Sequence, residues 1–345
     1  MHQSRTTQPR STRISRGFGL LEQLVCLALG LLLLMVLGHS LVSAKTLTHQ
    51  LRQRAGEQES IGLVTHIFGA VLNGAGHLGC LDSAESVVKL LNTNWSNLGP
   101  LAPGPAVEIV ADPRNSPDFA DIDNLAEGAQ ALIVRGFARP LAKLNQPLAQ
   151  HRGEGWLHDS SLRIDSGDVV LISDCRQGAM FSATGTWHPQ GRVRFSWAVG
   201  DAGLDNGLVG ELLDGTHVSG GLSQMGGGFA ADAALWGASG SRLYVAESRV
   251  QTDLPQTRGL WQKPAGGSAL EMVTGVDGLR FRYGAWRSGG GVQIGYFDAA
   301  HLPTDARVVL LSIRFFLAST QHGPDRGVVW RPVEIAIPLN ASIAS

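Results

Sequence analysis

One carboxylate in this sequence stands where a charge is costly. Glu22 lies close to the start of a strongly apolar segment, and no Asp, Glu, Lys or Arg occurs between Glu22 and Lys45. An isolated charge inside a membrane costs on the order of 2.5–3.5 kcal/mol even on scales derived from membrane insertion. Glu22 could therefore lie at the membrane interface, or it could pair with a cation on a neighbouring helix.

The uncharged segment is long enough to cross a bilayer. Residues 23–44 give 22 residues, and a helix of this length spans about 33 Å, which fits a hydrocarbon core of about 30 Å. A secretory signal has a shorter apolar run, of about 7–15 residues. The basic residues before the segment favour a cytoplasmic N-terminus, although Lys45, Arg52 and Arg54 on the other side weaken the asymmetry. The basic residues before the segment are Arg5, Arg10, Arg13 and Arg16.

The residues around Glu22 form a pattern that resembles the leader junction of type IV prepilins. They are Arg16-Gly17-Phe18-Gly19-Leu20-Leu21-Glu22, preceded by a basic tail. The resemblance implies that prepilin peptidase cuts between Gly17 and Phe18 and methylates the new N-terminal Phe18. It also implies that Glu22, then the fifth residue, pairs with the terminal ammonium of a neighbouring subunit. Gly19 departs from the Thr or Ser that is usual at its position.

Two later blocks narrow the resemblance to minor pilins of the PilW type. Gly74–Cys80 resembles the element that follows the helix in that family, and Val273–Gly284 resembles a block of its head. Tyr296–Ala299 and Val308–Phe316 continue in matching order. The resemblance implies assembly of the pilus, at its initiation or tip, with other minor pilins, the major pilin, prepilin peptidase and the inner-membrane assembly machinery. The chain would reside in the bacterial inner membrane, with its head in the periplasm, and then in the filament.

The expected fold is α+β: a long N-terminal, membrane-rooted helix packed on an antiparallel β-sheet head. Apolar residues at spacings of three and four extend the helix beyond the membrane, through Ile61, Val64, Phe68 and Leu72 to the glycines Gly74 and Gly76. We expect a leader at 1–17, a helix at 18–76 and a head at 77–345, with a loop-rich insertion near 92–130. Long loops are also expected at 200–228. Strands are expected at 131–137, 168–173, 193–197, 243–247, 279–286, 292–297, 307–318 and 334–339.

The three cysteines have different expected roles. Cys26 lies inside the apolar segment and is interpreted as a small packing residue. Cys80 and Cys175 would both be periplasmic, where disulfides form readily. A bond between them would close a loop of 95 residues (175 − 80), worth at most about 4–5 kcal/mol in the chain-entropy model. Two free thiols are the alternative.

No catalytic motif of the serine hydrolase, zinc peptidase or P-loop kind occurs, so we expect neither an enzyme nor a cofactor. A formal net charge of −1 does not favour nucleic-acid binding. His66 and His77 have no evident third ligand, and no metal site is expected. Two acid-rich stretches could bind Ca²⁺, but they fit turns and helix caps equally well. They are Asp112, Asp118, Asp121, Asp123 and Asn124, and then Asp201, Asp205 and Asn206.

Two other functions remain open at this stage. The J-type minor pseudopilin of type II secretion shares the leader and the overall plan, although the long body and the Val273–Gly284 block argue against it. A periplasmic binding module or adhesin could use the helix only as a tether. In that case Glu22 would be dispensable and Gly17 would not be cut.

Overall fold

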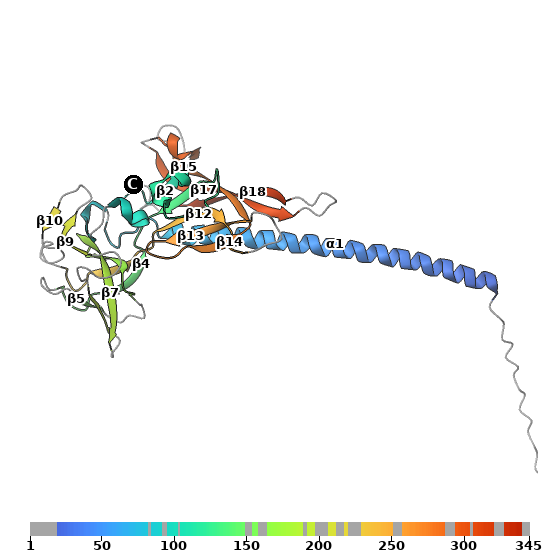
Figure 1. Ribbon diagram of the computed structural model, residues 1–345, viewed down its shortest axis with the longest axis horizontal. Helices are drawn as coiled ribbons and strands as arrows, with labels where there is room; N and C mark the ends of the chain where they lie inside the picture. Colours follow the sequence, from blue (N-terminus) through green and yellow to red (C-terminus); the bar gives the residue numbers. More distant parts are fainter. Residues whose placement is uncertain are drawn as a thin grey trace, which may run out of the picture. The chain divides into compact units, whose positions relative to one another are not determined.

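The computed structural model (Figure 1) describes residues 19–81, 84–91, 95–102, 104–148, 154–157, 164–188, 192–196, 206–211, 217–219, 229–250, 257–286, 294–303, 306–320 and 328–339. Gly17, Phe18, Asp201 and Asp205 lie outside these residues. The chain divides into an N-terminal unit, residues 1–56, and a C-terminal unit, residues 57–345. Each is described by itself below.

The helix α1 spans Leu20–Asn73 without a break, so the predicted helix is confirmed with slightly shorter bounds. Its end is set by glycines. Gly74 N and Ala75 N bond back to the Val71 and Leu72 carbonyls, and Gly76 has a φ of 69°, in the left-handed region that favours glycine. Gly76 N then donates to Arg135 O at 2.8 Å, which leads the chain away from the helix.

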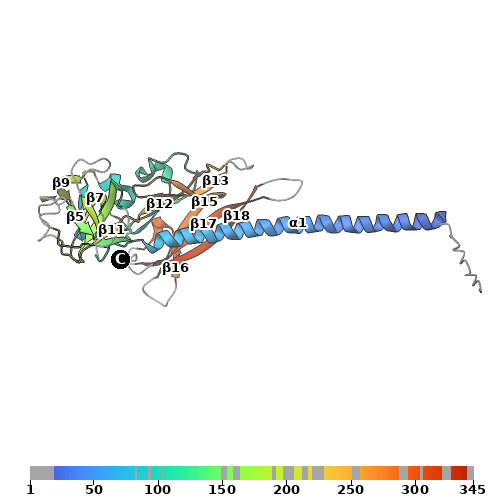
Figure 2. The same ribbon diagram turned by 90° about the horizontal axis from the view of Figure 1, so that it is seen from below.

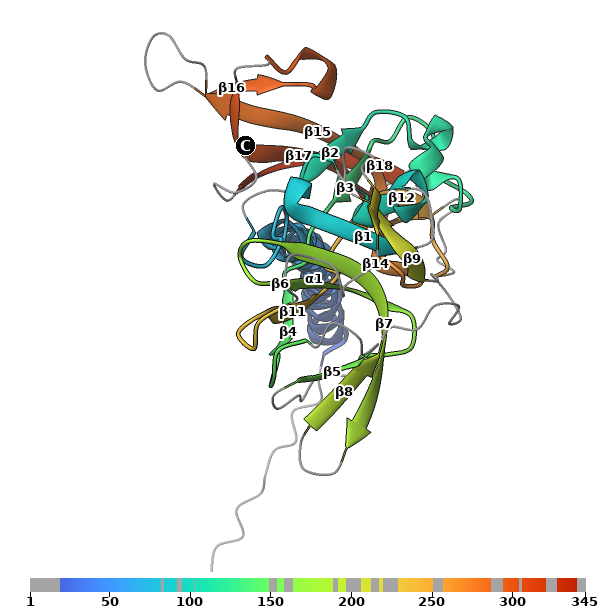
Figure 3. The same cartoon turned by 90° about the vertical axis from the view of Figure 1, so that its left-hand side faces the viewer.

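The strands of the C-terminal unit form three sheets of nine, five and four strands. In the nine-stranded sheet seven strands follow one path and two more attach to it through β7 (Figure 3). In path order they are β10 (His217–Ser219), β9 (Asn206–Glu211), β1 (Val87–Leu91), β7 (Gly178–His188), β6 (Asp168–Ser173), β11 (Ala234–Gly237) and β4 (Arg139–Lys143), with β8 (Arg192–Ser196) and β5 (Glu154–Leu157) attached.

The five-stranded sheet has a core on each face. Its order is β14 (Leu270–Thr274), β13 (Arg258–Pro264), β12 (Ser241–Glu247), β3 (Ala131–Val134) and β2 (Val107–Val110). Leu243 and Val245 of β12 share a buried cluster with α1, whereas Tyr244 and Ala246 lie in a second cluster with Phe119. Side chains of successive strand residues point to opposite faces, so this alternation follows from the strand itself.

The four-stranded sheet and the end of α1 share one core. Its order is β16 (Ile294–Phe297), β15 (Val276–Trp286), β17 (Arg307–Thr320) and β18 (Val328–Pro338). Val64, Phe68 and Leu72 of α1 are buried in the same cluster as Phe281 of β15 and Phe315 of β17. The Phe68 and Phe281 rings meet edge to face, with centroids 5.9 Å apart. Figure 2 shows β15, β17 and β18 beside the last turns of α1.

One tyrosine joins the two smaller sheets. The Tyr283 hydroxyl of β15 donates to Val107 O at 3.0 Å and accepts from Ile109 N at 3.2 Å. Both partners belong to β2, the edge strand of the five-stranded sheet, so the hydroxyl satisfies backbone groups that an edge would leave unpaired. Burial raises the pKa of Tyr283, which keeps the donor protonated.

Several expectations about the head are corrected. The head has three sheets instead of one, and β1 pairs with β7 in parallel, so the sheets are not wholly antiparallel. The region near 92–130, expected to be loop-rich, also contains the short strand β2 and short 3-10 helices, and the region 200–228, where long loops were expected, also contains β9 and β10. These strands have three to six residues, too few for an alternating pattern to stand out. The 3-10 helices are η1 (Ala84–Ser86), η2 (Trp95–Leu101), η3 (Pro113–Asn115) and η4 (Pro117–Phe119), with η6 (Ala299–His301) near the C-terminus.

The shared core gives a direct prediction for Phe68→Ala. Phe68 is fully buried, so the truncation should lower the free energy of unfolding of the C-terminal unit by about 3–5 kcal/mol. Urea unfolding of the full chain in detergent, followed by tryptophan fluorescence, measures it. Leu63→Ala on the same helix is the control, because Leu63 is 43% exposed and should lose about 1 kcal/mol or less. Equal losses would contradict this packing.

Candidate functional site

The first candidate site is the apolar part of α1 that carries Glu22. Large apolar side chains point outward all around the helix from Leu20 to Leu51, each more than half exposed within the chain. An apolar surface on every side is typical of a helix that crosses a membrane, and α1 is long and apolar enough to do so. Glu22 lies in the first turn, and its backbone N donates to Gly19 O at 2.9 Å. A carboxylate there also interacts favourably with the helix dipole.

A carboxylate on such a helix can bind a cation from another molecule. Within the N-terminal unit, the described residues offer Glu22 no hydrogen bond to its side chain and no ion pair. The predicted cleavage and methylation positions, Gly17 and Phe18, lie outside the described residues. Cys26 lies exposed on the same helix as a free thiol.

The second candidate is the junction where the chain leaves α1. Cys80 and Cys175 form a disulfide, with their Cα atoms 4.7 Å apart, in agreement with the predicted pairing. Cys175 lies in the turn between β6 and β7 with a φ of 67°, a conformation that non-glycine residues rarely adopt. Asp174 Oδ1 holds this turn by accepting from Arg176 N at 3.1 Å and Gln177 N at 3.0 Å. The bond therefore fixes the exit from the helix to the nine-stranded sheet.

Glycines explain the sequence block Gly74–Cys80 physically. Gly79 has a φ of 69°, and a Cβ there would lie 2.5 Å from Ser173 Oγ and from Trp236 Nε1. A Cβ at Gly136 would collide with Gly74 O. The His77 and Trp236 rings meet edge to face, with centroids 5.0 Å apart. The block thus allows the helix exit to pass close to β6 and β11 of the nine-stranded sheet, which a side chain at Gly79 would prevent.

The acid-rich loop pairs with cations from the five-stranded sheet. Asp121 accepts from Arg242 through both oxygens, at 2.6 and 2.8 Å, and from Lys263 Nζ at 2.6 Å. The hydrogen bond from Arg242 holds the pKa of Asp121 well below its usual range. Arg242 also donates to Asp118 O, and its side chain is only 10% exposed. The loop is therefore fastened to the sheet by a charge network.

The other candidate metal ligands do not converge. Asp112 caps η3 by accepting from Arg114 N and Asn115 Nδ2, and Asn124, with a φ of 58°, turns the chain. Asn206 begins β9. In the part of the chain that the structure describes, no three His, Cys, Asp or Glu side chains could hold one metal ion.

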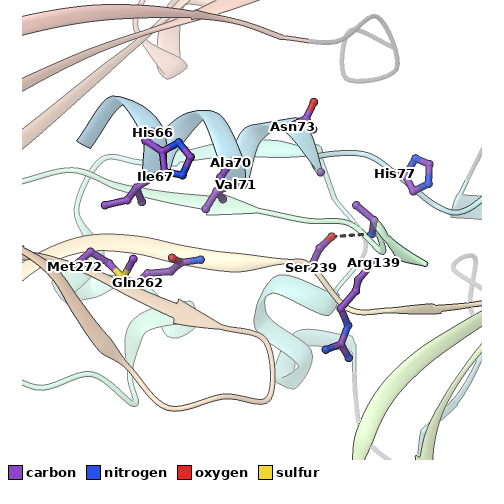
Figure 4. A pocket seen from close by; sticks show the side chains of 12 residues that line it. His66, Ile67, Ala70, Val71, Asn73, His77, Arg139, Ser239, Gln262 and Met272 are labelled. Atoms are coloured by element: carbon purple, nitrogen blue, oxygen red, sulfur yellow. Dashed lines mark hydrogen bonds between the residues drawn. The ribbon is translucent and has the colours of Figure 1, made fainter. Parts of the chain in front are cut away.

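His66 and His77 line one cavity of about 670 Å³ beside the end of α1 (Figure 4). The two imidazoles lie at opposite ends of the view, and the Arg139 side chain points away from both. The wall between them is mainly apolar, with Ile67 and Met272 facing each other across it. Among the described residues of this cavity, the two imidazoles therefore do not come together.

A second cavity of about 660 Å³ lies over the other face of the five-stranded sheet, beside Asp121. The Arg249 guanidinium stacks 5.0 Å from the Trp261 ring centroid, and Lys263 points to Asp121. The sequence singled out Asp121, Asp123 and Asn124, which line this cavity, but not their neighbours Arg249, Trp261 and Lys263. Residues that pair at this site are up to 142 positions apart along the chain, as Asp121 and Lys263 are, and no local spacing indicates such pairs.

Scans against protein-family models, curated proteins and solved structures find no match for this chain. The resemblance to a known family therefore rests on the sequence blocks described above. The features that bear on its function are the helix, the junction and the surfaces of the C-terminal unit.

The charge network predicts an acid-dependent loss of stability. Asp121→Asn should lower the free energy of unfolding by about 1–2 kcal/mol at pH 7, because the carboxylate is half exposed and solvent screens the pair. A lowered pKa means that the stabilisation is present above the unfolded-state pKa of about 3.9 and fades as the pH falls below it. Urea unfolding at pH 7 and pH 3 tests both statements. The difference in free energy of unfolding between the unsubstituted protein and the variant should be smaller at pH 3.

Asp123→Asn is the matched control in the same loop. Asp123 is exposed, and the described residues give it no ion-pair partner, so its replacement should change the stability by about 0.5 kcal/mol or less. An equal effect of the two substitutions, or a difference that does not change with pH, would contradict the assigned network.

Proposed function

We propose that this chain is a minor type IV pilin of the PilW type, which takes part in starting or assembling a pilus. The observation that carries the proposal is the position of Glu22. It is the fifth residue after the Gly17–Phe18 junction and lies in the first turn of a 54-residue helix whose first part is apolar on every side. The same helix ends buried in the core of a C-terminal unit rich in β-strands.

The proposed mechanism is assembly by charge pairing within apolar surroundings. Cleavage after Gly17 frees an ammonium group at Phe18, and methylation keeps it charged. The Glu22 carboxylate of one subunit pairs with the Phe18 ammonium of the next, so neither charge remains alone between packed helices. The pair selects one register between subunits, because sliding the helices would separate both charges.

The proposal also specifies where the protein resides and which proteins it contacts. Before assembly α1 would hold the subunit in the inner membrane, with the N-terminus cytoplasmic and the C-terminal unit periplasmic. The disulfide between Cys80 and Cys175 fits an oxidising compartment. Other minor pilins, the major pilin and the assembly machinery would be the partners, and prepilin peptidase the processing enzyme.

Replacing Glu22 distinguishes the proposed pilin from a periplasmic module that uses the helix only as a tether. We expect Glu22→Ala to leave cleavage and membrane insertion intact while it lowers the amount of the protein in sheared pili at least tenfold, because the ammonium loses its partner. Immunoblots of sheared pili and of membranes measure both pools. Glu59→Ala is the control, since Glu59 is an exposed carboxylate of α1 outside the apolar segment.

A normal amount of the Glu22→Ala variant in pili would contradict the proposed role of the carboxylate. If the protein were missing from pili whatever the residue at position 22, the minor pseudopilin of type II secretion or the tethered periplasmic binding module would replace the pilin as the better account.

A further inference from the structure

The four-stranded sheet has one face in the core and one that faces away from it. The inward residues, such as Phe281 and Phe315, pack with α1. The residues between them along each strand point the other way, and we call that side the outer face. It includes Arg280, Arg282 and Trp286 of β15, with Arg314 of β17.

Large apolar side chains gather on the outer face. Beyond α1, six described side chains of this kind are exposed by 36% or more, and four belong to this sheet. The four are Tyr296 (52% exposed), Trp286 (44%), Ile294 (41%) and Trp330 (36%). Exposed aromatic residues that lie singly need no explanation, but a contiguous group marks an interaction site.

The strand register makes three of the four contiguous. Ile294 lies directly opposite Trp286, and Tyr296 lies opposite Gly284. Gly284 has no side chain, so Leu310 and Ile294 close over it: a Cβ there would lie 2.5 Å from Leu310 Cγ and 3.2 Å from Ile294 Cγ2. The result is one apolar patch across β16, β15 and β17.

Arginines border the patch and outnumber the acids. Arg314 pairs with Glu334 at 2.8 Å, and Arg282 pairs with Asp298 at 3.5 Å. Arg280 lies opposite Arg314 in the register, and Arg307 lies opposite Trp286. Both are exposed, and no carboxylate among the described residues pairs with either. Like charges directly opposite each other are unfavourable in a sheet, so a carboxylate brought to this row would relieve a repulsion.

We infer that the outer face of the four-stranded sheet is a docking surface for a second, different protein, whose contact surface is apolar at its centre and carries carboxylates that meet Arg280 and Arg307. Trp, Tyr and Arg are the residue types that dominate binding energy at protein interfaces. The positive charges of Arg280 and Arg307 favour a partner that carries carboxylates. The inference goes beyond the proposed function and does not depend on it.

Photo-crosslinking in cells tests the inference with the full chain. Tyr296 is replaced by p-benzoylphenylalanine, an aromatic residue of similar shape, and Leu270 is replaced in the same way as a control. Leu270 is 59% exposed but belongs to β14 of another sheet. We expect an adduct with one other protein at position 296 and none at 270, with acidic residues close to the cross-linked position when the adduct is sequenced by mass spectrometry.

Charge reversal supplies the second arm. Arg280→Glu combined with Arg307→Glu should lower the yield of that adduct at least tenfold, while Arg139→Glu, a half-exposed arginine of β4 in another sheet, should leave it unchanged. The Cys80–Cys175 bond, read from mobility on non-reducing gels, shows that each variant has folded.

Three results would overturn the inference. No adduct at position 296 would show that the patch has no protein partner. An adduct with a second copy of the chain or with lipid would assign the surface to another occupant. An adduct that persists at full yield in the charge-reversed variant would show that carboxylates do not recognise the arginines.

Discussion

The C-terminal unit depends on burying the last turns of α1 in a core that two sheets share. Val64, Phe68 and Leu72 lie in one cluster with side chains from β12, β15 and β17. Both small sheets bury apolar side chains in this cluster together with the helix. Apolar burial is the main favourable term in folding, so this contact joins the folding of the unit to the helix that also carries Glu22. The continuous helix α1 therefore carries the proposed assembly segment at its start and contributes to the core of the C-terminal unit at its end.

Around the end of α1, chain segments lie so close together that small residues are needed and buried backbone groups must find hydrogen-bond partners. Gly79 passes Ser173 and Trp236 at distances that leave no room for a Cβ, and the disulfide at Cys80 holds the exit in place. The Tyr283 hydroxyl supplies the hydrogen bonds that the edge of β2 lacks. These bonds give partners to buried backbone groups that would otherwise be left unsatisfied.

The sequence was most informative where a pattern is long or local. The helix was predicted within three residues at each end, and β6 was predicted with the bounds Asp168–Ser173 that the structure has. The pairing of Cys80 with Cys175 was expected because both would lie in the periplasm, and the structure has this disulfide. The acid-rich loop shows the limit of such reasoning, since Asp121 pairs with Arg242 across 121 residues. Short strands such as β2 and the division into three sheets depend on contacts between distant segments, which no local spacing reveals.

The central claim is that Glu22 is the fifth residue of a processed filament subunit, and the mature N-terminus tests it most directly. Mass spectrometry of the protein from cells with and without prepilin peptidase would decide it. The account predicts a chain that begins with N-methylated Phe18 only when the peptidase is present. An intact leader, or a cut beyond Ala44, would contradict the account and leave α1 as a tether or a removed signal.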